Sequence, residues 1–204
     1  QKGAASYVPK RSLARDLVAT VENVLEVTRS EHDQRRAIAC LVSSEACFEI
    51  DNDIARVPAL VGFLEASLAR LPGCDETALI QVGVALREAV VNAIVHGNLE
   101  VDSALRETDA AAYDELCARR AVVAPFRDRR VRVIARQTLR EASFVVRDEG
   151  PGFDPRSLPD PTDATQIEQV HGRGLLLIRT FMDEVRHNER GNEITLIKRF
   201  APAS

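Results

Sequence analysis

Three polar residues with helical spacing carry the first candidate chemistry in this chain. Glu88, Asn92 and His96 stand at i, i+4 and i+8, so in a helix they share one face. A carboxylate and an amide one turn apart suit a proton acceptor beside a hydrated divalent cation, because Mg²⁺ takes oxygen ligands and leaves much of its shell to water and phosphates. The alternative is an ordinary exposed polar stripe on an amphipathic helix, with His96 as a polar residue at its end.

The second motif is Asp148-Glu-Gly150-Pro-Gly152-Phe153, which ends a strand-like run. Two glycines spaced by one residue let the backbone approach a flat ligand closely. Asp148 at the strand end can accept a hydrogen bond from an exocyclic amine. The alternative is a tight turn, for which Gly-Pro-Gly is also suited.

The third motif is His171-Gly172-Arg173-Gly174-Leu175, directly before a predicted helix. A Gly-x-Gly pair at a helix N-terminus presents free N–H groups and the positive end of the helix dipole to a phosphate. Arg173 can add a charge-assisted contact to a terminal phosphate. The alternative is a simple joint between a loop and a helix.

The periodicity of apolar residues predicts the elements that position these motifs. Helices are expected at 12–43, about 54–71, about 75–96, 109–120 and 174–182, and strands at 47–50, 130–136, 142–148, 184–187 and 193–200. Residues 154–170 are rich in Pro, Asp and Thr and predict a flexible loop. Helices first and paired strands afterwards favour an α+β class, a two-layer sandwich whose mixed, mostly antiparallel sheet carries helices on one face.

Composition excludes several classes of function. The chain has 204 residues, enough for one domain plus an appendage, and its net charge of −4 provides no broad attraction for nucleic acid. The four cysteines are scattered without a Cys-x-x-Cys pair, which favours reduced thiols over a zinc site. No apolar run approaches 18 residues, so we expect a cytoplasmic protein that does not enter a membrane.

The order and spacing of the three motifs resemble the GHKL ATPase superfamily. That superfamily contains the histidine-kinase ATP-binding domains, gyrase, the Hsp90 chaperones and mismatch-repair proteins. The resemblance covers about residues 47–200, and the run from Leu86 to Asn98 is most similar to the serine kinases that act as anti-sigma factors. One departure is the segment 99–130, which is longer than the usual link between helix and strand.

The resemblance implies ATP and Mg²⁺ as cofactors and assigns a role to each matching residue. Glu88 would be the general base toward a protein serine hydroxyl, and Asn92 would be the Mg²⁺ ligand. Asp148 would hold the adenine amino group with support from Thr195. The lid would be residues 154–170. The base pocket would be lined by Gly150, Gly152 and Phe153. The phosphates would be wrapped by Gly172, Arg173, Gly174 and Leu175.

The N-terminal part has a second, shorter resemblance. Residues 1–28 resemble the last strand and helix of a response-regulator receiver domain, with Lys10 at the position of that family's lysine. The alternative is a solvated leader before a helix. Residues 29–46 are expected to be a linker helix whose apolar stripe can serve dimerisation, and residues 47–200 the ATP-binding domain.

The function implied is a regulatory protein-serine kinase of the anti-sigma-factor type, acting as the output domain of a response regulator. Its partner would be a sigma factor or a STAS-type anti-anti-sigma protein, with no direct contact to nucleic acid or membrane, and a homodimer is expected. Two alternatives stay open. One is a non-catalytic, nucleotide-dependent switch that captures a partner. The other is a histidine kinase ATP-binding domain, although His32 lacks the usual Glu-x-x-x-Pro context of a phosphoacceptor.

Overall fold

The computed structural model describes residues 13–157 and 173–201. The chain divides into two units between Leu41 and Val42. In the first unit, helix α1 (Leu13–Ala39) confirms the helix predicted at 12–43 over a shorter range, and its apolar residues Val21 and Leu25 are exposed. The receiver-like residues 1–12, Lys10 among them, lie outside the described residues.

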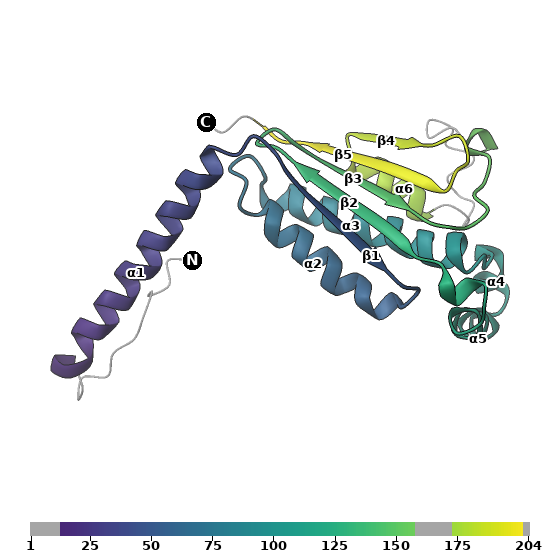
Figure 1. Ribbon diagram of the computed structural model, residues 1–204, viewed down its shortest axis with the longest axis horizontal. Coiled ribbons are helices and arrows are strands. Elements are labelled where there is room, and N and C mark those ends of the chain that lie inside the picture. Colours follow the sequence, from purple (N-terminus) through teal and green to yellow (C-terminus); the bar gives the residue numbers. More distant parts are fainter. Residues whose placement is uncertain (1–12, 158–172, 202–204) are drawn as a thin grey trace. The chain divides into compact units, whose positions relative to one another are not determined.

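The second unit is built on one antiparallel sheet of five strands in the order β1-β2-β3-β5-β4 (Figure 1). The strands are β1 (Ser44–Ile50), β2 (Val131–Gln137), β3 (Glu141–Arg147), β4 (Glu184–His187) and β5 (Glu193–Arg199). Each pair of neighbours is antiparallel, so the α+β class is confirmed and the parallel component of the predicted mixed sheet is not found among these strands. β1 begins three residues before the predicted strand, because its pairing with β2 extends to Ser44.

The register decides which face of the sheet each residue joins. Val133 is opposite Val146, and Val146 is opposite Ile194, and all three side chains are buried against the helices. Because successive side chains point to opposite faces of a strand, Thr195 lies on the face away from these helices.

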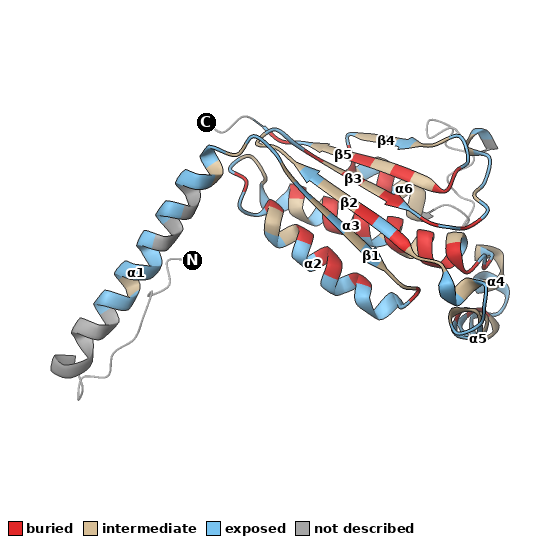
Figure 2. Cartoon of the chain, in the orientation of Figure 1, coloured by how far each residue is buried: buried red, intermediate tan, exposed pale blue. Residues whose placement is uncertain are grey.

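Three helices cover one face of the sheet (Figure 1), namely α2 (Val57–Leu68), α3 (Glu76–Asn92) and α6 (Arg173–Phe181). Figure 2 shows the buried residues gathered where α2 and α3 meet the strands. Asp75 starts α3 by accepting a hydrogen bond from the Ala78 N–H at 2.7 Å. The apolar side of α3 forms much of the core, with Val82, Ala85, Leu86, Ala89 and Val90 all buried.

Helix α3 continues into a π-helical segment, Ala93–Asn98, which ends within two residues of the predicted end at His96. π-Helical turns inside α-helices occur frequently at functional sites. By length and composition, Glu76–Asn98 could cross a membrane, with a mean hydropathy of 1.6. However, 56% of that stretch is buried inside the domain, so its apolar character is accounted for by the core.

Two stretches differ from the predicted helices. The helix expected at 54–71 is split into a 3₁₀ turn at Ile54–Arg56 and α2, because Pro58 has no N–H and is accommodated only in the first turn of a helix. The long segment 99–130 contains α4 (Ser103–Thr108), which was not predicted, and α5 (Ala110–Ala121), which was. A six-residue helix is too short to show an apolar period, so its pattern alone does not reveal it.

Candidate functional site

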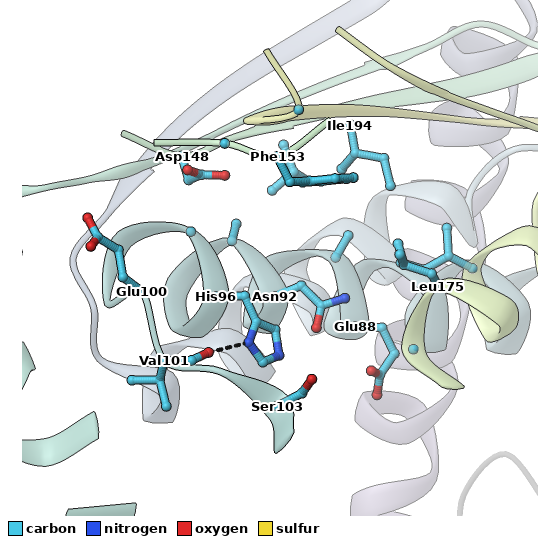
Figure 3. Close-up of a pocket in the computed structure, with 18 of the residues that line it drawn as sticks. Glu88, Asn92, His96, Glu100, Val101, Ser103, Asp148, Phe153, Leu175 and Ile194 are labelled. Carbon is cyan, nitrogen blue, oxygen red and sulfur yellow. Dashed lines mark hydrogen bonds between the residues drawn. The ribbon is translucent and has the colours of Figure 1, made fainter. Parts of the chain in front are cut away.

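A cavity of about 890 Å³ lies beside α3, between the sheet, the start of α6 and the α4–α5 segment (Figure 3). Residues from all three sequence motifs line it. From α3 come Glu88 and Asn92, and from the loop after β3 come Asp148 and Phe153. Gly174 and Leu175 of α6 complete the set, so the fold brings together motifs that are far apart in the sequence.

The first turn of α6 approaches the polar face of α3 closely at Gly174. A Cβ at Gly174 would lie 2.7 Å from Oε2 of Glu88 and 3.3 Å from Nδ2 of Asn92. Glycine therefore lets the backbone of α6 approach the half-buried Glu88 and Asn92 side chains. The third residue of this face, His96, is exposed, and its Nδ1 lies 2.6 Å from the carbonyl oxygen of Val101. Since a carbonyl only accepts, Nδ1 carries the proton and His96 holds the chain where the 99–130 segment begins.

Asp148 is a buried carboxylate at the end of β3, with 8% of its surface exposed. Its Oδ1 accepts a hydrogen bond from the Gly150 N–H at 2.8 Å. Burial raises the pKa of Asp148 from 3.8 to about 6, although the Gly150 hydrogen bond and the charges of Arg129 and Arg190 act in the opposite direction. At neutral pH the side chain is therefore an ionised acceptor in a buried part of the cavity, suited to an N–H donor on a ligand.

The end of α3 lies directly against the Asp148 motif. A Cβ at Gly97 would overlap the Asp148 carboxylate, and a Cβ at Gly150 would overlap the carbonyl oxygen of Gly97. Both positions therefore need glycine for packing. Glycine at these two positions therefore lets the end of α3 pack directly against the Asp148 carboxylate and the loop that follows it.

A buried amide network holds this junction. Asn98, which is fully buried, donates from Nδ2 to Oδ1 of Asn52 at 2.8 Å. Its own Oδ1 accepts the Glu149 N–H at 2.8 Å. On the other side, Asn192 donates from Nδ2 to the carbonyl oxygen of Asp148 at 2.9 Å. The position of Asp148 is thus set by hydrogen bonds from both neighbouring segments.

The loop after β3 is fixed by two residues in the left-handed region. Gly152 has φ +79° and Gly191 has φ +73°, a conformation that strongly favours glycine. A Cβ at either position would overlap the facing backbone, which belongs to Arg190 and Phe153 respectively. The Phe153 ring, 41% exposed, packs edge-on against His187 with centroids 5.5 Å apart, and both side chains line the cavity. Burial, followed by the charge of Arg179, lowers the pKa of His187.

Thr195 is not among the residues that line the cavity, and its predicted support of the adenine site stays a prediction. Its neighbours Glu193 and Ile194 both line the cavity, and Ile194 does so from the face of β5 that is buried against the helices. Gly172 and residues 158–170 of the predicted lid lie outside the described residues. Arg173 is the first residue of α6, and its predicted phosphate contact stays a prediction.

Comparison with known proteins identifies the family. A family model described as the histidine kinase-like ATPase domain matches residues 50–198, which is most of the chain. The chain belongs to this family. It is also similar to the Serine/threonine-protein kinase BtrW of Bordetella bronchiseptica, with 35% identity over 78 residues that make up 36% of this chain and 55% of that protein. The chain thus spans about half the length of this curated relative.

Family membership implies ATP as the ligand of this domain and supports a kinase-type activity. The cavity fits a purine nucleotide. Asp148 provides an ionised acceptor for an amino group, and Gly97 and Gly152 line the same cavity beside it. The buried apolar side chains of Val146 and Ile194 line the same cavity and can pack on that base.

Some of the site was missed by sequence reasoning. Asn98 and Asn192 are not among the predicted site residues, yet both are buried and hold the Asp148 segment. Ile194 could have been found, since it is one residue from the predicted Thr195 and belongs to the apolar side of β5. Arg106 and Tyr113 line the cavity from the 99–130 segment, and no local pattern connects that segment to the motifs.

Proposed function

We propose that this chain is a regulatory protein-serine kinase of the anti-sigma-factor type, which phosphorylates a serine of a STAS-type anti-anti-sigma protein. The observation that carries the proposal is the placement of Glu88 beside Asn92, with both side chains held against Gly174 at the first turn of α6. The similarity to a protein named as a serine/threonine kinase supports the same conclusion.

The chain's own residues would divide the work as follows. Glu88 would accept the proton of the substrate serine hydroxyl, and Asn92 would ligate Mg²⁺ through its amide oxygen, a hard ligand that this ion accepts. Bound Mg-ATP supplies the phosphoryl group and neutralises part of its charge. Asp148 would hold the adenine at the far end of the cavity. Phosphoryl transfer depends mainly on positioning and charge neutralisation, so these few groups suffice.

The regulatory setting is part of the proposal. A sigma factor is the second candidate partner, and the domain would act in the bacterial cytoplasm as the output of a response regulator. A homodimer would form through α1, whose exposed apolar residues Val21 and Leu25 offer a surface for a second copy.

The test is phosphate transfer from labelled ATP in Mg²⁺ to candidate STAS-domain proteins. We expect label on a serine with the wild type, a loss of at least about a hundredfold with Glu88→Gln, and unchanged transfer with Glu115→Gln. Glu115 is exposed on α5 and does not line the cavity, so it is a matched control.

Equal transfer by the wild type and Glu88→Gln would overturn the role of Glu88. If the wild type binds ATP and a partner but labels no serine, the chain is a non-catalytic switch and the kinase proposal is wrong. Label on a histidine of an added acceptor protein would instead make it a histidine kinase ATP-binding domain.

A further inference from the structure

The segment 99–130, which contains α4 and α5, forms one wall of the cavity. Ser103, Arg106 and Tyr113 of this wall all line it together with Glu88 and Asn92. Figure 3 shows Ser103 next to the α3 face that carries Asn92 and His96, with its hydroxyl directed toward that face. Arg106 follows Ser103 by three residues, so both belong to the same side of α4.

The wall is fastened at both ends to the residues that follow α3. Arg120, near the end of α5, donates from Nη1 to the carbonyl oxygens of Leu99 and Glu100 at 2.7 Å each. Arg129, at the end of the same segment, donates from Nη1 to the carbonyl oxygen of Asn98 and to Oε1 of Glu100, again at 2.7 Å each. These bonds tie the start and the end of the segment that carries α4 and Arg106 to each other.

The cavity has an excess of negative charge that a triphosphate must overcome. Its described lining contains a single guanidinium, that of Arg106. Glu100 in the lining is paired with Arg129, and the lining has five more carboxylates, those of Glu88, Asp102, Glu107, Asp148 and Glu193. The sequence of residues 158–172 contains no Lys or Arg and has three acidic residues. Apart from the predicted contact of Arg173, Arg106 is therefore the cation that the described lining offers to the phosphates.

Arg106 is exposed and available for that role. Its guanidinium carbon lies 5.8 Å from the centroid of the Tyr113 ring, which is buried beneath it. In the described part of the chain no carboxylate forms an ion pair with Arg106. A guanidinium that rests on an aromatic ring is pre-oriented, and its forked donors match phosphate oxygens.

We propose that Arg106 binds the terminal phosphate of ATP and makes the 99–130 wall the part of the domain that distinguishes ATP from ADP. Glu88 and Asn92 would face the terminal phosphate. Arg106 lies on the same side of α4 as Ser103, whose hydroxyl is directed toward the α3 face that carries Asn92. The inference rests on the proposed use of this cavity for ATP. It adds a specificity residue from a segment that the three motifs do not include.

The test compares binding of ADP and of the β,γ-imido analogue of ATP, both with Mg²⁺, by titration calorimetry of the whole chain. Arg106→Gln should weaken the ATP analogue by about tenfold or more, as expected for a lost charge-assisted hydrogen bond. Binding of ADP should change by less than about twofold, because the contact is to the phosphate that ADP lacks. Arg119→Gln is the control, since Arg119 is an exposed arginine of the same wall outside the cavity.

The variant Arg106→Lys distinguishes loss of the positive charge from a disturbance of the fold, because it keeps the charge. It should recover part of the affinity for the ATP analogue, whereas a merely structural role would weaken ADP and the analogue alike. Equal weakening of both nucleotides, or no weakening of either, overturns the assignment of Arg106. If the wild type binds neither nucleotide, the ATP site itself is refuted and this inference with it, a result distinct from failure of Arg106 alone.

Discussion

The substitution Asp148→Asn should stabilise the nucleotide-free domain at neutral pH while weakening its ligand site. In the folded chain, burial raises the pKa of Asp148 to about 6 from 3.8, so the folded state holds the proton more tightly than the unfolded chain does. The free energy of unfolding therefore falls as pH rises from about 4 to about 6, and it stays reduced above that range. Because the pKa rises by about two units, ionised Asp148 lowers the free energy of unfolding by about 3 kcal/mol at a pH well above 6.

The assay is urea unfolding at pH 5 and pH 7.5, two conditions that should both keep the domain folded. At pH 5 the free energy of unfolding of the wild type should be about 1.4 kcal/mol higher than at pH 7.5 from this residue alone. The reason is that Asp148 is then largely protonated in the folded state but largely ionised in the unfolded state. Asn at this position does not titrate. Between pH 5 and pH 7.5 the free energy of unfolding of the wild type should thus fall by about 1.4 kcal/mol more than that of the variant.

The pH-dependent change in the free energy of unfolding is compared between the wild type and Asp148→Asn, so that the contributions of all other titrating groups cancel. Asp114→Asn serves as the control, because it makes the same change of side chain at an exposed position of α5. If wild type and Asp148→Asn change in parallel between the two pH values, the pKa of Asp148 is not raised and the burial argument fails.

The same variant tests the ligand. Mg-ATP bound only to the native state must raise the melting temperature of the wild type. Asp148→Asn replaces a charged acceptor by a neutral amide, so its melting temperature should rise far less at the same ATP concentration. A full rise in the variant would show that Asp148 does not hold the base.

Two further substitutions follow from the packing. Gly174→Ala should change the melting temperature little, because its Cβ meets the flexible end of Glu88, yet transfer of labelled phosphate should fall at least about tenfold as that carboxylate is displaced. Unchanged transfer would show that the Glu88 position is not critical. Asn98→Ala should lower the free energy of unfolding in urea by about 2–4 kcal/mol, since it leaves the Glu149 N–H and the Asn52 amide oxygen without their buried partner. A loss below about 1 kcal/mol would mean that water replaces the amide.

The order and type of most elements could be predicted from the sequence because their apolar periods are strong. The run from Asp75 to His96 shows both a cap and an apolar stripe, and α3 with its π-helical end occupies nearly that range. Boundaries set by partners were not predictable. β1 extends back to Ser44 because β2 offers a register there, and that pairing partner is more than eighty residues away.

The site could be predicted to the extent that its residues occur in short motifs. Glu88, Asn92, Asp148 and Gly174 line one cavity as expected. Thr195 does not line that cavity, and a choice between adjacent strand residues depends on which face is covered, since a shift of one residue reverses the face. The contribution of residues 99–130 was not predictable, since it depends on long-range hydrogen bonds such as that of Arg120 to Leu99.

The energetics of Asp148 connect this fold to its function. A buried carboxylate with a raised pKa costs stability in the free domain, and Asn would fit the same hydrogen bonds from Gly150 without that cost. The surrounding structure nonetheless holds Asp148 in place through Asn192 and the end of α3. A cost of this kind is reasonable where a ligand recovers it, because an amino group that donates to the carboxylate restores the interaction lost with water. The free domain should therefore be only moderately stable, and nucleotide should be one of its main stabilising partners.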